Sequence, residues 1–228
     1  RYRTFKEITY DSLTTLRELR AELDLRYCER THGTIKVFSD PASLAKAVAV
    51  AERLGEHGVV HRVLDRAGVA EVEPSLAPVA ERLAGGILHP DDESGDAHLF
   101  VRKLAGAAEA AGVRFEFDTA VTGLRTEAGR IVAAATAAGD LSADACVLAA
   151  GSYSATLLAG LGLRLPVRPV KGYSITVPCA DERLGPCRPV TDDTLHIAVT
   201  PFGDRLRVAG TAEFTGLDHS VGEPRIRN

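Results

Sequence analysis

The sequence predicts a mixed α/β protein, and three observations support that class. The run from Ala145 to Ala150 is apolar without polar alternation, which is typical of a short strand buried on both faces. Gly151 can turn the backbone sharply, and Ser152 or Ser154 can cap a helix that follows. Beyond this turn, three segments alternate polar and apolar residues like strands of an antiparallel sheet with one exposed face: 167–177, 195–200 and 205–214.

The N-terminal part predicts helices and strands in alternation. Leucines at helical spacing, with charged residues between them, indicate an amphipathic helix at the start. Asp40 and Asp65 are expected to begin two further helices, because an aspartate can cap the first turn. The expected elements are a helix over 9–25, a strand over 33–39, a helix from Pro41 to near Gly58, a strand over 59–64 and a brief helix that Glu73-Pro74-Ser75 ends.

The middle of the chain predicts a helix followed by an antiparallel meander. Small and apolar residues share one face of the helix, which suits close packing on a sheet. Turn residues at 127–129 and 139–140 separate the segments that follow. The expected elements are a strand over 85–90, a helix over 97–112, and strands over 113–117, 120–126 and 130–136.

Carboxylates crowd the loop that precedes this helix: Asp91, Asp92, Glu93 and Asp96. Such a cluster could bind calcium, but it lacks the regularly spaced ligands of a calcium loop. A solvated loop that caps the helix is the better explanation, so we predict no metal site.

Composition argues against several classes of protein. Lys and Arg number 27 against 31 Asp and Glu, the formal net charge is −4 and the signs are interspersed, so no nucleic-acid surface is indicated. The four cysteines show neither a C-x-x-C pair nor a ligand spacing with histidine, which favours reduced thiols in a cytoplasmic protein. No apolar run is long enough to span a bilayer, and no signal peptide opens the chain. From the start at Arg1 and the absence of methionine, we expect an internal part of a longer protein.

The turn after the apolar run is the first candidate binding site. In open α/β sheets, ligands bind where such turns lie. The small side chains of Ala149, Ala150 and Gly151 would let a cofactor approach the backbone, and the start of the next helix favours an anion such as a pyrophosphate. A purely structural turn is the alternative, because a fold does not define a function. The sequence contains no G-x-G-x-x-G fingerprint for a dinucleotide.

The segment from Val167 to Thr176 supplies the second candidate site. Lys171 and Tyr173 lie two apart, so both point to the same face of an extended chain. Their ammonium and hydroxyl groups could hold a carboxylate, and Gly172 would let a flat ring approach the backbone. The alternatives are an ordinary surface cation and an edge aromatic. His196 is a weaker candidate, because no partner can be predicted for it.

Four stretches in this order and spacing resemble one family. They are GGILHPDDESGDAHLF from Gly85, DACVLAAGSYS from Asp144, PVKGYSITVP from Pro169 and HIAVTPFGDRLRVAGTAE from His196. Together they resemble the small subunit of the bacterial D-amino-acid dehydrogenases, in the FAD-dependent D-amino-acid oxidase superfamily. The resemblance covers nearly the whole chain and corresponds to the middle of the family's sequence. The family's N-terminal glycine-rich FAD motif and its C-terminal flavin and substrate segment are missing.

The resemblance implies two interleaved portions. Residues 95–162 would belong to an FAD-binding α/β portion with a β meander. Residues 1–94 and 163–228 would belong to a substrate portion built on a large mixed or antiparallel sheet. The chain by itself is expected to be inactive, because the two missing segments carry flavin contacts.

The family's pattern also implies roles for single residues. The implied contacts with FAD are Val121 near the adenine, the turn of Ala149, Ala150 and Gly151 near the adenosine and phosphates, and Gly172 beside the flavin ring. The hydride acceptor is the flavin, so no catalytic side chain is assigned. The candidates for substrate contact are Lys171, Tyr173 and His196.

The implied reaction is oxidative deamination of a D-amino acid, such as D-alanine, to a 2-oxo acid and ammonia. Electrons would pass to a quinone or respiratory carrier, which implies peripheral contact with the inner membrane. The close alternative is an oxygen-using glycine, sarcosine or D-amino-acid oxidase. The alternative from another class is a non-catalytic fragment or interaction module.

Overall fold

The computed structural model describes residues 2–222, with the side chains of 7–181 and 183–222. The chain forms two compact units. One contains the residues up to Gly112 together with Gly172–Thr211, and the other contains Val113–Lys171 together with the residues from Ala212 on. The predicted portions change instead at residues 94 and 162. Which unit binds which ligand stays a prediction.

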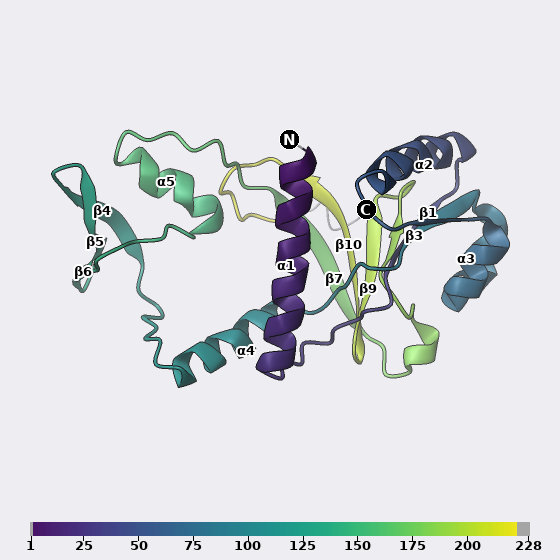
Figure 1. The fold of residues 1–228 in the computed structure, drawn as a ribbon, viewed down its shortest axis with the longest axis horizontal. Coiled ribbons are helices and arrows are strands. Elements are labelled where there is room, and N and C mark those ends of the chain that lie inside the picture. The colour runs from purple at the N-terminus through teal and green to yellow at the C-terminus, as the bar shows by residue number, and fades with distance from the viewer. Residues whose placement is uncertain (1, 223–228) are drawn as a thin grey trace. The chain divides into compact units, whose positions relative to one another are not determined.

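A seven-stranded mixed sheet belongs to the first unit and confirms the predicted mixed α/β class (Figure 1). Its strands are β1 (Thr34–Phe38), β2 (Arg62–Leu64), β3 (Gly85–His89), β7 (Lys171–Pro178), β8 (Val190–Asp192), β9 (Ile197–Phe202) and β10 (Arg205–Glu213). Their order is β2-β3-β1-β8-β9-β10-β7. β1 pairs antiparallel with β3 and parallel with β8, and β9 and β10 form the predicted hairpin. The short strand β8 was not predicted.

Helices flank this sheet, and three of them begin where the sequence predicts a start. The helices are α1 (Tyr2–Glu22), α2 (Pro41–Gly55), α3 (Arg66–Val72) and α4 (Ala97–Ala110), with a 3₁₀ helix η1 (Pro74–Arg82) after α3. The side chains of Asp40, Asp65 and Asp96 accept hydrogen bonds from N–H groups in the first turns of α2, α3 and α4. These N–H groups have no acceptor within their own helix, so the caps stabilise the helix starts. The predicted caps are therefore confirmed.

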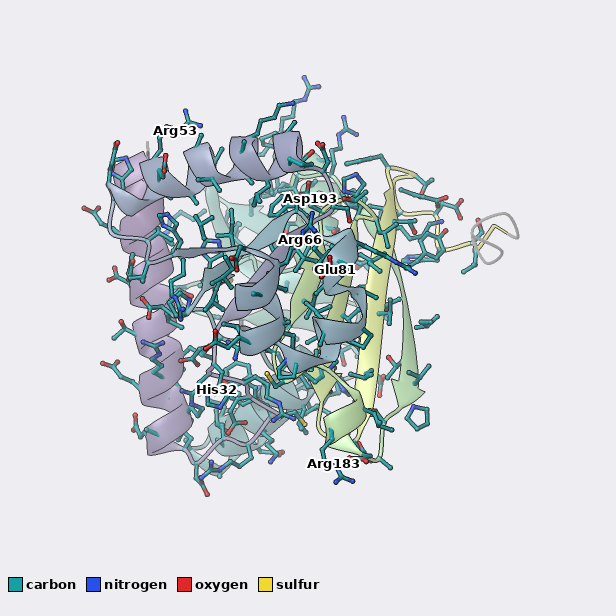
Figure 2. All side chains as sticks on the ribbon, turned by 90° about the vertical axis from the view of Figure 1, so that its right-hand side faces the viewer. His32, Arg53, Arg66, Glu81, Arg183 and Asp193 are labelled. Atoms are coloured by element: carbon teal, nitrogen blue, oxygen red, sulfur yellow. The ribbon has the colours of Figure 1, made fainter. Side chains whose placement is uncertain are left out.

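Both faces of β1 are covered, because its side chains alternate between two apolar clusters. Ile35 and Val37 pack with Val69 of α3 in one cluster, whereas Phe38 packs with Ala51 of α2 in the other. Figure 1 shows α2 and α3 beside β1 and β3, in agreement with these clusters. Figure 2 shows the outer surfaces of the same helices, where Arg53 points away from α2 and Arg66 lies close to Glu81.

The acidic loop before α4 is held by arginines. Glu93 Oε1 lies 2.6 Å from Arg17 Nε, and its Oε2 lies 2.5 Å from Arg20 Nη1. Burial would raise the pKa of Glu93, but hydrogen bonds from both arginines lower it below its ordinary value. Asp96 lies 3.2 Å from Arg205, and its pKa is lowered mainly by the backbone N–H bond of its helix cap. Within residues 2–222, no three His, Cys, Asp or Glu side chains are grouped as a metal site requires.

The second unit contains an antiparallel three-stranded sheet in the order β4-β5-β6. Its strands are β4 (Val121–Glu127), β5 (Arg130–Thr136) and β6 (Gly139–Ser142). A single 3₁₀ turn, η2 (Gly151–Tyr153), leads into the short helix α5 (Ser154–Ala159). α5 lies against β4, so the turn before it belongs to the same unit as the meander.

Two predicted strands do not form. Residues 113–117 pair with no strand in the described chain, and the third strand of the meander is β6, where the sequence predicts only a turn. The apolar run 145–150 is also unpaired among the described residues, and Val147 is 93% exposed rather than buried. An apolar run becomes a strand only where a neighbouring strand supplies ladder hydrogen bonds. The strands of the meander pair with one another and supply none to this run.

The cysteines Cys28, Cys146, Cys179 and Cys187 are free, in agreement with the predicted reduced thiols. Burial, and then the hydrogen bond to Glu73, raise the pKa of the Cys187 thiol. Of the helices between residues 2 and 222, none combines the length and the apolar character that a membrane span requires.

Candidate functional site

The turn at Gly151 leaves the backbone open, as the sequence predicts. Gly151 has a φ of +53°, in the left-handed region that favours glycine. A Cβ atom placed there would meet no atom within 4 Å apart from its chain neighbours. Ala149 is exposed and Ala150 half-buried. The predicted serine cap is wrong, because the residue before α5 is Tyr153, whose side chain makes no capping hydrogen bond.

Val121 lies in the same unit as this turn. It is the first residue of β4, it is exposed, and the β4–β5 pairing shifts register between Val121 and Gly123. Because α5 follows the turn and lies against β4, the second unit contains all four residues predicted to contact the adenosine side of FAD. Their contact with FAD stays a prediction.

β7 carries Lys171, Gly172 and Tyr173 in the predicted arrangement. Lys171 and Tyr173 are half-buried and Gly172 is exposed, as the alternation of side chains along a strand requires. A Cβ atom on Gly172 would meet no atom within 4 Å apart from its chain neighbours. One face of the strand therefore presents a cation and a phenol, and the other is open at Gly172.

Lys171 has partners that the sequence analysis missed. Its Nζ lies 3.1 Å from Glu213 Oε2 and donates a 2.6 Å hydrogen bond to the carbonyl of Ser220. The side chains of Lys171 and Glu213 are 18% and 16% exposed, so the pair is partly shielded from water. Nearby in the chain, Tyr153 Oη lies 3.2 Å from His219 Nε2. These residues are far apart in the sequence, so no local pattern predicts their contacts.

His196 is placed apart from the β7 residues. It lies exposed in the turn before β9, with a φ of +54°. Ile197, the next residue, pairs with Gly210 of β10, and the sheet order puts β9 two strands from β7. The structure therefore groups Lys171 and Tyr173 on one strand but not His196 with them, and its contact with substrate stays a prediction.

The open backbone at Gly151 and Gly172 fits a flat cofactor such as FAD. At both positions a side chain would occupy space that is free in the chain. The residues that would hold FAD are Val121 and the turn 149–151 on the adenosine and phosphate side, and Gly172 beside the flavin ring. The fit comes from small or absent side chains, so it is a fit of shape.

Known proteins similar to this chain share one activity in name. The chain is 45% identical over 215 residues to the D-amino acid dehydrogenase of Xanthobacter autotrophicus, which covers 94% of this chain and 51% of that protein. It is 44% identical over 210 residues to the D-amino acid dehydrogenase of Vibrio cholerae, which covers 92% of this chain and 50% of that protein. The chain thus spans about half the length of the curated relatives it matches.

Solved structures and a family match agree with this similarity. The crystal structure of glycine oxidase from Geobacillus kaustophilus has a TM-score of 0.84 at 26% identity, over 96% of this chain and 59% of that chain. This likeness supports the mixed α/β fold with its large mixed sheet. The family described as FAD dependent oxidoreductase matches residues 1–228. The chain therefore belongs to this family, called DAO, whose cofactor is FAD.

Proposed function

We propose that the protein to which this chain belongs oxidises D-amino acids, such as D-alanine, to 2-oxo acids and ammonia. The observation that carries the proposal is the 45% identity, over 94% of this chain, to a protein named D-amino acid dehydrogenase. The arrangement of β7 supports it, because Lys171 and Tyr173 share a face that could bind a carboxylate. An α-amino acid carries such a carboxylate next to the carbon that is oxidised.

Each group of residues has a role in this proposal. FAD, when bound, accepts a hydride from the α-carbon of the substrate. The Lys171 ammonium and the Tyr173 hydroxyl donate hydrogen bonds to the substrate carboxylate and so orient the α-carbon. Gly172 leaves room for the flavin ring, while Val121 and the turn 149–151 contact the adenosine and phosphates.

We further propose a quinone or respiratory carrier as electron acceptor, reached by peripheral contact of a cytoplasmic protein with the inner membrane. The word dehydrogenase in the names of the relatives supports this acceptor. Oxygen is the second candidate, because the chain has the fold of a glycine oxidase. The two acceptors correspond to a dehydrogenase and an oxidase of the same family.

The choice of acceptor can be measured on the full-length protein. With D-alanine as substrate, we expect rapid reduction of dichlorophenolindophenol and little consumption of oxygen by the same preparation. L-alanine is the control and is expected to support neither reaction. Comparable turnover with oxygen would contradict the dehydrogenase and favour an oxidase. Absence of turnover with either acceptor would favour a non-catalytic module.

A further inference from the structure

Glu213 holds the ammonium of Lys171 from the far end of β10. Its Oε2 lies 3.1 Å from Lys171 Nζ, and both side chains are mostly buried. The carbonyl of Ser220 accepts a second hydrogen bond from the same ammonium at 2.6 Å. An ion pair shielded from water is screened less by salt than one on the open surface. The ammonium of Lys171 is therefore anchored by two acceptors from one short segment of the chain.

The backbone next to Glu213 is strained. Thr211 has a φ of +43°, in the left-handed region that a β-branched residue rarely adopts. A left-handed residue in a strand interrupts the alternation of side chains and redirects those that follow. Strain of this kind persists where surrounding contacts hold it, and it is common at functional sites. Here the ion pair between Glu213 and Lys171 follows two residues later.

We propose that Glu213 is a positioning residue of the substrate site, which fixes the Lys171 ammonium at the first residue of β7. The inference rests on the proposed function, in which Lys171 binds the substrate carboxylate. A lysine side chain is long and flexible, so a cation that must meet a carboxylate in one orientation needs to be held in place. Glu213 supplies the charge that holds it, and Tyr173 lies on the same face of the strand.

The test is a double-mutant cycle in the full-length protein, with D-alanine as substrate. Glu213→Gln keeps the size of the side chain but removes its charge, and is expected to raise KM about tenfold or more while kcat changes by less than about threefold. Glu213→Asp keeps the charge and is expected to give a KM between those of the wild type and Glu213→Gln. In a Lys171→Met background, Glu213→Gln is expected to have no further effect on KM, because Glu213 acts through Lys171.

Glu116→Gln is the matched control. Glu116 lies in the same unit and pairs with Arg114 at 3.3 Å, but that pair is exposed to solvent. Because exposed ion pairs contribute little, this substitution is expected to leave KM unchanged. Any effect of Glu213→Gln beyond this control is therefore specific to the pair with Lys171.

Two results would overturn the inference. One is an unchanged KM in a folded Glu213→Gln protein, with Glu213→Asp taking its place if the first variant does not fold. The other is full additivity of the Glu213 and Lys171 substitutions, which would show that Glu213 acts independently of Lys171. A wild-type protein that does not oxidise D-alanine would instead refute the proposed function and, with it, this inference.

Discussion

Replacement of Glu73 by alanine is expected to lower the free energy of unfolding by about 3–5 kcal/mol. Glu73 is 1% exposed, and its carboxylate accepts hydrogen bonds from the backbone N–H groups of Ser75, Cys187 and Arg188. The Arg188 Nε also lies 3.8 Å away, with a side chain that is mostly buried. Alanine would leave these donors without their acceptor and the guanidinium without its counter-charge.

Urea unfolding followed by circular dichroism measures this loss, and Glu81→Ala is the matched control. Glu81 pairs with Arg66 at 3.3 Å (Figure 2), but its side chain is 92% exposed. Such a surface pair contributes about 0–1 kcal/mol, so the control should unfold close to the wild type. If Glu73→Ala were as stable as Glu81→Ala, the buried carboxylate would not be the tie between η1 and the segment that precedes β8.

Replacement of Gly172 by valine is expected to deplete the full-length protein of FAD without lowering its stability. The new side chain meets no atom of the described chain within 4 Å of its Cβ, and valine is favoured over glycine in a strand. If the flavin ring packs on this glycine, the added bulk costs about 1–3 kcal/mol, which is roughly a five- to 150-fold loss of FAD affinity. The ratio of flavin to protein absorbance in the purified protein measures the effect.

Gly106→Val is the control for this substitution. Gly106 lies on α4, and a Cβ atom there likewise meets no atom within 4 Å. The flavin content of Gly106→Val is expected to equal that of the wild type. Equal flavin content in both variants would show that Gly172 does not adjoin the flavin.

The features that the sequence predicted correctly are encoded locally. Asp40, Asp65 and Asp96 cap α2, α3 and α4 because each cap depends on residues within one helical turn. The positive φ of Gly151 and the alternation of Lys171, Gly172 and Tyr173 along β7 are local in the same way. These local signals suffice to place the two candidate binding segments.

The features that the sequence did not predict depend on distant residues. The apolar run 145–150 was predicted to be a buried strand, yet none of residues 2–222 supplies a strand to pair with it. The contacts of Glu213 with Lys171 and of His219 with Tyr153 join segments that are far apart in the chain. Periodicity and capping carry no information about such contacts, so the polar surroundings of Lys171 became visible only in the structure.

The visible absorption spectrum of the full-length protein, recorded without oxygen, tests the central claim most directly. We expect a flavin band that D-alanine bleaches and that L-alanine leaves unchanged, because hydride transfer to FAD reduces it. That result would establish the cofactor, the reaction and the stereochemistry together. A colourless protein, or a flavin that neither isomer reduces, would contradict the proposed oxidation of D-amino acids.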